Sequence, residues 1–406
     1  MRVSRRAERV EPFYVMELAK AATRLAAEGG AGQRPMIYLN IGEPDFTAPP
    51  LVQQAAERAI RDGRSQYTQA LGLPALREAI AGWYATHFGA AVDASRIVVT
   101  AGASAALQLA CLALIDAGDE ILMPDPSYPC NRQFVQAAEG VARMVPCGPE
   151  QRFQLSAEQV HAHWGERTRG VLLASPSNPT GTSIARDELQ RIAAAVRERQ
   201  GITLLDEIYL GLSHDAAFGQ TALTLPDGLG ETVISVNSFS KYFNMTGWRL
   251  GWLVLPPALV PAVERLAQHL FICPSAISQH AALACFEPDS LAEYERRRAT
   301  FKARRDYFIP ELNRLGLTVP VMPDGAFYAW AEVGALCERW GIAPPGDSPE
   351  TGGSWPLAFE LMRRCQLAAT PGRDFAQAEA GRYLRFSTAN SMEQLQEAVA
   401  RLEAAW

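Results

Sequence analysis

The chain has 406 residues, 48% of them hydrophobic, and a formal net charge of −6 at pH 7. This length can bury a large core and favours two or three domains over one. The acidic balance argues against a nucleic-acid partner, because binding to phosphates needs a basic surface that displaces counterions. Small molecules are therefore the expected ligands.

Cysteine usage and hydropathy favour a protein that stays in the cytoplasm. The seven cysteines are scattered and form no CxxC pair, so the sequence suggests neither a disulfide framework nor a zinc site. The N-terminus is basic, but no apolar segment follows it, and no run reaches the length of a membrane span. We expect a cytoplasmic protein with no membrane segment and no metal.

Between about residues 95 and 255, short apolar runs alternate with small-residue turns and helical stretches. Most runs are unbroken rather than alternating, which is typical of strands covered on both faces. The pattern predicts a mainly parallel α/β sheet with helices on both sides, among them helices over 104–118 and 185–201. The seven runs are RIVVTAG (96–102), DEILMPD (119–125), ARMVPC (142–147), GVLLASP (170–176), ITLLDEI (202–208), TVISVNS (232–238) and RLGWLVL (249–255).

After about residue 290 the pattern changes to that of a second, smaller α+β domain, which the N-terminal residues are expected to join. A charged helix is predicted over 291–312, and its arginines are interpreted as a solvated face. Antiparallel strands are predicted within 317–333 and 382–389. The segment 341–356, rich in Pro, Gly and Ser, is expected to be a surface loop or a lid.

The ends of the predicted strands carry groups that suit a phosphorylated ligand. In an open α/β sheet, ligands bind beyond the carboxyl ends of the strands. The turn of Gly102, Ala103 and Ser104 opens a helix there, and helix N-termini hold anions. The segment NSFSK…GWR adds two hydroxyls and a guanidinium that suit a phosphate: Ser238, Ser240 and Arg249.

Other strand ends offer groups for a flat, cationic ring. Asp206 ends an apolar strand, where a buried carboxylate needs a cationic partner such as a protonated ring nitrogen. Asn178 offers an amide donor, Tyr209 a phenol and Tyr128 an aromatic face. A phosphate, a ring cation, a ring oxygen and a flat ring together describe pyridoxal phosphate. Lys241 is then the lysine that forms a Schiff base with it.

The chain resembles the class I/II aminotransferases of the aspartate aminotransferase superfamily, which are pyridoxal phosphate enzymes of fold type I. Nine motifs follow the family's order: LNIGEPDF, QYTQALGLPALREAI, VTAGASAAL, PSYP, SPSNPTG, LLDEIY, NSFSKYFNMTGWRLGW, PDGAFYAW and RYLRFSTA. The resemblance implies a mainly parallel seven-stranded sheet flanked by helices. It also implies a large cofactor domain at residues 48–288 and a small α+β domain made of residues 1–47 and 289–406.

The matching motifs imply roles around the cofactor ring. Lys241 would bind the cofactor covalently, and Asp206 would pair with the pyridine nitrogen. Asn178 and Tyr209 would bond the ring hydroxyl, and Tyr128 would stack on the ring. Lys241, Asp206 and Tyr209 are the implied catalytic residues.

The resemblance also assigns the phosphate and the substrate carboxylate. Arg385 would bind the substrate α-carboxylate in a bidentate manner, helped by the backbone at Gly42 and by Asn178. In a homodimer, Tyr67 would reach the phosphate of the neighbouring subunit. The other phosphate-binding residues implied are Gly102, Ala103, Ser104, Ser238, Ser240 and Arg249.

The implied reaction moves an amino group between an L-amino acid and a 2-oxo acid by a ping-pong mechanism. Ser104 replaces the lysine of some relatives that are specific for acidic substrates, so we expect neutral or hydrophobic donors, with 2-oxoglutarate or pyruvate as acceptor. Four alternatives stay open: a β-eliminating lyase, an acyl-CoA-condensing synthase, an aspartate-specific aminotransferase, and a regulatory domain that senses pyridoxal phosphate. The side chains expected near the substrate are Phe13, Tyr14, Phe46, Phe243 and Phe327.

Overall fold

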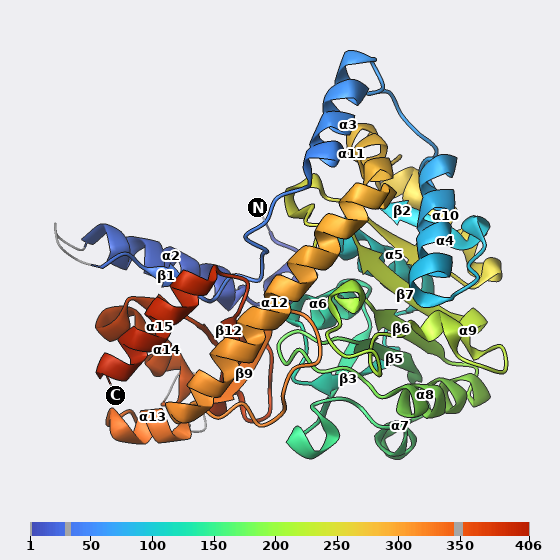
Figure 1. The fold of residues 1–406 in the computed structure, drawn as a ribbon. Coiled ribbons are helices and arrows are strands. Elements are labelled where there is room, and N and C mark those ends of the chain that lie inside the picture. The colour runs from blue at the N-terminus through green and yellow to red at the C-terminus, as the bar shows by residue number, and fades with distance from the viewer. Residues whose placement is uncertain (1, 29–33, 345–351, 406) are drawn as a thin grey trace.

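A seven-stranded sheet forms the centre of the computed structural model, which describes residues 2–28, 34–344 and 352–405 (Figure 1). Its strand order is β2-β8-β7-β6-β5-β3-β4, and only β8 runs antiparallel to its neighbours. The mainly parallel fold and all seven predicted strands are confirmed. The strands are β2 (Ile97–Thr100), β3 (Glu120–Asp125), β4 (Val141–Pro146), β5 (Thr168–Ala174), β6 (Ile202–Asp206), β7 (Val233–Ser238) and β8 (Gly251–Val254).

Helices cover both faces of this sheet, so that its inner strands are buried at almost every position. Successive side chains on a strand point to opposite faces. Leu172 therefore packs with the core around α5 and α10, whereas Leu173 packs with the core around α7 and α8. The covering helices are α3 (Pro50–Arg61), α4 (Pro74–Phe88), α5 (Ala103–Leu114), α6 (Pro129–Ala137), α7 (Ala157–His163), α8 (Arg186–Glu198), α9 (Leu229–Thr232), α10 (Val260–Leu270) and α11 (Ala276–Ala282).

Two small sheets lie beside the large one and join both ends of the chain. β1 (Ile37–Tyr38) pairs in parallel with β10 (Leu367–Ala368), which joins an N-terminal segment to a C-terminal one. The other sheet is antiparallel, in the order β11 (Thr370–Pro371), β12 (Tyr383–Ser387) and β9 (Tyr328–Glu332). The helices around these sheets are α2 (Tyr14–Glu28), α13 (Gly334–Arg339), α14 (Ser354–Cys365) and α15 (Met392–Ala405), and a short α1 (Arg5–Arg9) precedes them.

The antiparallel strands predicted within 317–333 and 382–389 are confirmed as β9 and β12, although residues 319–327 before β9 are not regular strand. Before β9 a single bridge joins Thr318 to Glu332. Pro320 and Pro323 lie between the two and cannot donate to a strand ladder. Of the loop or lid predicted at 341–356, residues 345–351 lie outside the described residues, and residues 354–356 are not loop but begin α14.

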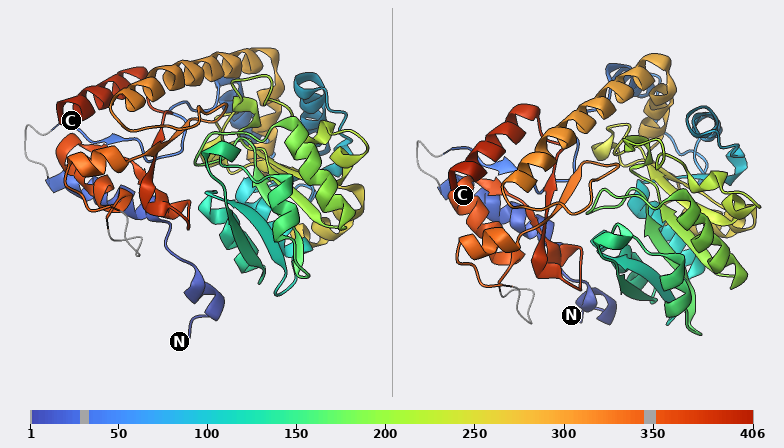
Figure 2. Two further views of the ribbon diagram at one scale, coloured as in Figure 1. Left: turned by 90° about the horizontal axis from the view of Figure 1, so that it is seen from below. Right: turned by 60° about the horizontal axis from the view of Figure 1, so that its bottom comes forward.

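The long helix α12 (Pro288–Arg314) packs against α15 and β9 and runs past both the large sheet and the small ones (Figures 1 and 2). The expectation that its arginines form a solvated face is wrong for Arg297 and Arg304, which are 8% and 5% exposed. These two guanidiniums bind carbonyl and carboxylate oxygens of the segment 42–47, so their burial is compensated.

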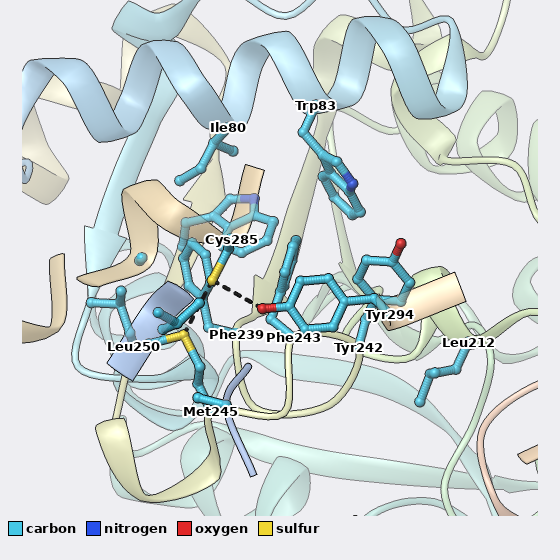
Figure 3. Packing of buried hydrophobic residues seen from close by; sticks show 14 of the residues in the cluster. Ile80, Trp83, Leu212, Phe239, Tyr242, Phe243, Met245, Leu250, Cys285 and Tyr294 are labelled. Carbon is cyan, nitrogen blue, oxygen red and sulfur yellow. Dashed lines mark hydrogen bonds between the residues drawn. The ribbon is translucent and has the colours of Figure 1, made fainter. Parts of the chain in front are cut away.

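The chain around Lys241 is fixed by an aromatic core (Figure 3). Phe239 and Phe243 are fully buried, and their ring centroids are 5.0 Å apart. In Figure 3 the hydroxyl of Tyr294 donates to Cys285, whose sulfur contacts Met245. Aromatic side chains therefore hold the backbone on both sides of the lysine.

Among the described residues, no helix is long and apolar enough to cross a bilayer. All seven cysteines are free thiols. In the same part of the chain, no three Asp, Glu, His or Cys side chains gather as a metal site would require.

Candidate active site

Lys241 lies just beyond the carboxyl end of β7. Its Nζ donates a hydrogen bond of 2.6 Å to the carbonyl oxygen of Gly42. Burial and, after it, the positive charge of Arg385 lower the pKa of Lys241 to about 8. An amine with this pKa is about one tenth uncharged at pH 7 and about half uncharged at pH 8, far more than an ordinary lysine, and the uncharged form can act as a nucleophile or a base.

Asp206, at the end of β6, is 4% exposed. Its Oδ1 accepts a hydrogen bond of 3.1 Å from the backbone N–H of Ile208. Burial raises the pKa of Asp206 to about 7, although this hydrogen bond and the charge of Lys241 oppose the shift. A cationic group beside this carboxylate would restore its charged form, so the site suits a protonated ring nitrogen.

Tyr209 and Asn178 lie on the loops that follow β6 and β5. The Tyr209 hydroxyl is 2.7 Å from the hydroxyl of Tyr328. The Oδ1 of Asn178 accepts a hydrogen bond of 2.8 Å from Nη1 of Arg385, which leaves the amide nitrogen of Asn178 as its donor group. The structure thus brings Asn178 of the large sheet and Arg385 of β12 into direct contact.

Arg385 is 3% exposed and is held from several sides. Its Nη2 donates 2.7 Å to the carbonyl oxygen of Asn40, and its guanidinium carbon lies 4.5 Å from the ring centre of Tyr328 and 4.7 Å from that of Phe375. Its Nε is buried and has no hydrogen-bond partner among the described residues. An oriented guanidinium with a spare N–H suits an anionic ligand such as a carboxylate.

The N-terminus of α5 meets the end of β7 and Arg249 at one edge of the sheet. Gly251 pairs with Ser238, and a Cβ on Gly251 would lie 2.7 Å from the first backbone nitrogen of α5. A Cβ on Gly102, which caps α5 at φ +86°, would lie 2.6 Å from Nη2 of Arg249. Glycine suits this position because L side chains rarely adopt φ +86° with ψ 167°, and its missing side chain also leaves room for the guanidinium.

Hydroxyls and backbone donors complete this edge. The Oγ of Ser238 accepts a 3.0 Å hydrogen bond from the backbone N–H of Ser240, and both serines are buried. Ser104 is exposed on the first turn of α5, which begins at Ala103. Backbone N–H groups, two hydroxyls and a guanidinium are the donor set that a phosphate requires.

The remaining predicted residues divide into those at the site and one away from it. The carbonyl of Gly42 binds the lysine amine. Tyr128 caps α6 and meets the ring of Phe13 edge to face, with centroids 6.3 Å apart. Tyr67 does not pack into the site of its own chain: it is 81% exposed, on the segment between α3 and α4.

Sequence reasoning missed the residues that support the site. Tyr328 lies in the motif PDGAFYAW without having been singled out, although it contacts both Tyr209 and Arg385. Arg297 and Arg304 were interpreted as solvated. They are seven positions apart, which is about two helical turns, so they lie on one face of α12. This spacing in the sequence could have indicated that the two arginines face the same partner.

A second unpredicted group ties the N-terminal helix to the site. Asp374 is 1% exposed, and its Oδ1 accepts 2.9 Å from the backbone N–H of Tyr14 at the start of α2. Its backbone carbonyl accepts 3.1 Å from Arg132 on α6. Burial raises the pKa of Asp374 to about 6, although the charges of Arg385 and Arg132 lower it in part.

Residues 34–402 match the family described as aminotransferase class I and II. This span includes all seven strands of the large sheet and every predicted cofactor-binding and substrate-binding residue, but not Phe13 and Tyr14. The chain therefore belongs to the class I and II aminotransferase family, and it is an aminotransferase.

Individual relatives cover almost the whole chain. A Mycobacterium tuberculosis protein named valine–pyruvate aminotransferase is 37% identical over 393 residues, which cover 97% of this chain and 96% of that relative. An aspartate aminotransferase of Rhizobium meliloti is 34% identical, with 99% of this chain and 96% of the relative covered. A crystal structure of an aminotransferase from Mycobacterium tuberculosis matches with a TM-score of 0.90 at 36% identity, and the match covers 100% of this chain and 99% of that one. Relatives at similar identity thus differ in their named substrates.

Proposed function

We propose that this aminotransferase uses pyridoxal 5'-phosphate to move an amino group between a neutral or hydrophobic L-amino acid and a 2-oxo acid by a ping-pong mechanism. The observation that carries the proposal is Lys241, a desolvated amine with its pKa lowered to about 8 at the end of a buried strand. The Tyr209 ring centre lies 5.7 Å from its Nζ, and the charges of Asp206 and of Arg385, which binds Asn178, act on its pKa; this carboxylate, phenol and amide suit the ring of the cofactor.

Each group on the chain has a distinct task in this proposal. When bound, the cofactor supplies a ring that accepts the electron pair left behind when the substrate Cα loses its proton. Lys241 would hold the cofactor, and its freed amine would take the proton from Cα, a role that typically contributes about 10²- to 10⁴-fold. Asp206 would keep a proton on the ring nitrogen, and Tyr209 and Asn178 would donate to the ring oxygen.

Binding of the phosphate and the substrate would use the remaining residues. Arg385 would orient the α-carboxylate, so that the Cα proton points towards the amine of Lys241. Tyr128 would stack on the ring, and Tyr67 would act from the partner subunit. The phosphate would be held by Gly102, Ala103, Ser104, Ser238, Ser240 and Arg249.

The choice of a neutral donor rests on Ser104, which stands where some relatives specific for acidic substrates have a lysine. A distal carboxylate without a cationic partner would be desolvated and unpaired, at a cost that a neutral side chain avoids. The name of the Mycobacterium tuberculosis relative agrees with this choice, whereas that of the Rhizobium meliloti relative favours aspartate.

Three further parts of the proposal concern the whole molecule. Residues 48–288 form the large domain, and residues 1–47 and 289–406 form the small one. The active form is a homodimer, since the exposed Tyr67 would complete the site of a second copy. The seven free thiols suit the reducing cytoplasm.

Borohydride reduction of the purified holoenzyme, followed by peptide mapping, tests the cofactor assignment. The pyridoxyl label should fall on Lys241, and a label on any other lysine would overturn it. Conversion of the bound cofactor to its amine form by an amino acid alone separates an aminotransferase from a β-eliminating lyase or an acyl-CoA-condensing synthase. Values of kcat/KM for alanine, methionine, phenylalanine, aspartate and glutamate then identify the donor, and a clear lead for aspartate would refute a neutral one.

A further inference from the structure

Tyr328 lies between two groups that the proposed function assigns to different ligands. It is the first residue of β9 and is 1% exposed. Its hydroxyl is 2.7 Å from that of Tyr209, and the two rings meet edge to face at 80°. The face of its ring lies 4.5 Å from the guanidinium carbon of Arg385. One side chain therefore contacts both the proposed ring-oxygen donor and the proposed carboxylate receptor.

The protons on the two phenols can be counted. Each tyrosine hydroxyl carries one proton, so it can donate one hydrogen bond and accept others. If Tyr209 donates to a ligand, it cannot also donate to Tyr328. In the 2.7 Å contact Tyr328 must then be the donor and Tyr209 the acceptor.

The surroundings of Tyr328 keep its hydroxyl in this contact. A Cβ on Gly42 would collide with the hydroxyl and would lie 3.2 Å from the ring carbon that bears it, so Gly42, whose carbonyl oxygen accepts from Lys241, closes that side. Arg385 covers one face of the ring, and Phe327 packs at 5.0 Å from its centre. Among the described residues, Tyr209 is the hydrogen-bond partner of this hydroxyl.

We propose that Tyr328 is a positioning residue that donates its proton to Tyr209, so that the proton of Tyr209 is directed to the ring oxygen of the bound cofactor. This inference rests on the proposed function. A hydroxyl that accepts a hydrogen bond is polarised and becomes a stronger donor. Tyr328 thus strengthens the contact between Tyr209 and the cofactor without touching the cofactor itself.

Removal of the Tyr328 hydroxyl should change the pH dependence of the cofactor absorbance in the holoenzyme. At high pH the nitrogen that joins Lys241 to the cofactor would be unprotonated. The negative charge on the ring oxygen would then be stabilised chiefly by the hydrogen bond from Tyr209. A weaker donor makes that charge less stable. The midpoint of the absorbance change should therefore rise by about half a unit to one unit in Tyr328→Phe.

The experiment compares wild type, Tyr328→Phe, Tyr209→Phe and the double variant as holoenzymes. Phenylalanine keeps the ring beside Arg385, so the KM for the amino acid should stay unchanged while kcat falls about three- to tenfold. In the Tyr209→Phe background, the second substitution should shift the midpoint no further, because Tyr328 would have no donor left to act through.

Two results would overturn the inference. One is an unchanged midpoint in Tyr328→Phe, and the other is an equal shift with and without the Tyr209 hydroxyl, which would make Tyr328 independent of Tyr209. A wild-type protein that gains no cofactor absorbance would instead refute the proposed function, and the inference would fall with it.

Discussion

The two halves of the candidate site are built in different ways. Asp206 and Ser238 are the last residues of β6 and β7, and Lys241 follows three positions later, so one sheet edge presents them together. The half that contains Arg385 and Gly42 depends on contacts between distant parts of the chain. Arg385 bonds Asn178, 207 positions away, and Gly42 bonds Lys241, 199 positions away. The first half follows from strand geometry, whereas the second depends on tertiary packing.

The largest effect is expected from the sheet-edge half. Lys241→Ala should lower the turnover number by at least about 10²- to 10⁴-fold, because no other amine replaces the proposed base. Cofactor binding should survive, since the phosphate contacts are on other residues. The exposed Lys302→Ala is the matched control, and it should keep full activity. An active Lys241→Ala enzyme would contradict the assignment.

Substitution of Arg385 tests the packing-dependent half directly. Arg385→Lys should lower kcat/KM about 10- to 100-fold for every amino acid, because a point charge cannot replace a planar fork held by Asn178 and Asn40. The control is Arg382→Lys, near the start of the same strand, which pairs with Glu332 on the surface. Steady-state kinetics on a panel of amino acids would measure both. A loss confined to one substrate would argue against binding of the common α-carboxylate.

Arg304 binds Asp45, which lies in the same segment as Gly42. Loss of this arginine should therefore impair the half of the site that contains Gly42 and Arg385 and leave the phosphate-binding half unchanged. Arg304→Met deletes the two hydrogen bonds to Asp45, of 2.8 and 2.7 Å, and should lower the free energy of unfolding by about 1–3 kcal/mol, because Asp45 is partly exposed. Activity should fall while the affinity for the cofactor phosphate is kept. Arg296→Met, on the exposed face of the same helix, should leave the free energy of unfolding nearly unchanged. Equal costs at both arginines, measured by urea unfolding, would remove the proposed role of Arg304.

The smallest expected effect is on pH dependence. The rate at which cofactor-free enzyme captures the cofactor should rise with pH around a midpoint near 8, because the attacking amine of Lys241 must be neutral and its pKa is lowered. Arg385→Met should move the midpoint up, since the arginine charge contributes to that lowering, and Asp206→Asn should move it down. Stopped-flow absorbance would give the profiles. A midpoint near the ordinary value for lysine, about 10.4, would contradict the desolvated amine.

Strand positions and sheet-edge residues were predictable from the sequence because both are local properties. Unbroken apolar runs identified all seven strands, and the residues at their ends are brought together as expected. The roles assigned to them stay predictions. The same local reasoning failed between Thr318 and β9, where an apolar pattern was interrupted by prolines.

The supporting residues could not be predicted because their partners are remote. An arginine is expected at the surface from its residue type alone. Only the fold shows that Arg304 has Asp45, 259 positions away, as its partner. The contact between the hydroxyls of Tyr209 and Tyr328 likewise joins residues that are 119 positions apart. Burial of a charged or polar group becomes favourable only when such a partner is present, and periodicity does not report on this.

The way α12 supports the segment 42–47 limits how this chain can change in length. Arg297 and Arg304 meet the same segment because seven residues of helix complete about two turns. Insertion or deletion of one residue between them would rotate one guanidinium by about 100° relative to the other, which would bury a charge without its oxygen partners. The number of residues between Arg297 and Arg304 is therefore fixed by these contacts. Substitutions on the exposed face of α12 do not change this spacing, whereas insertions and deletions do.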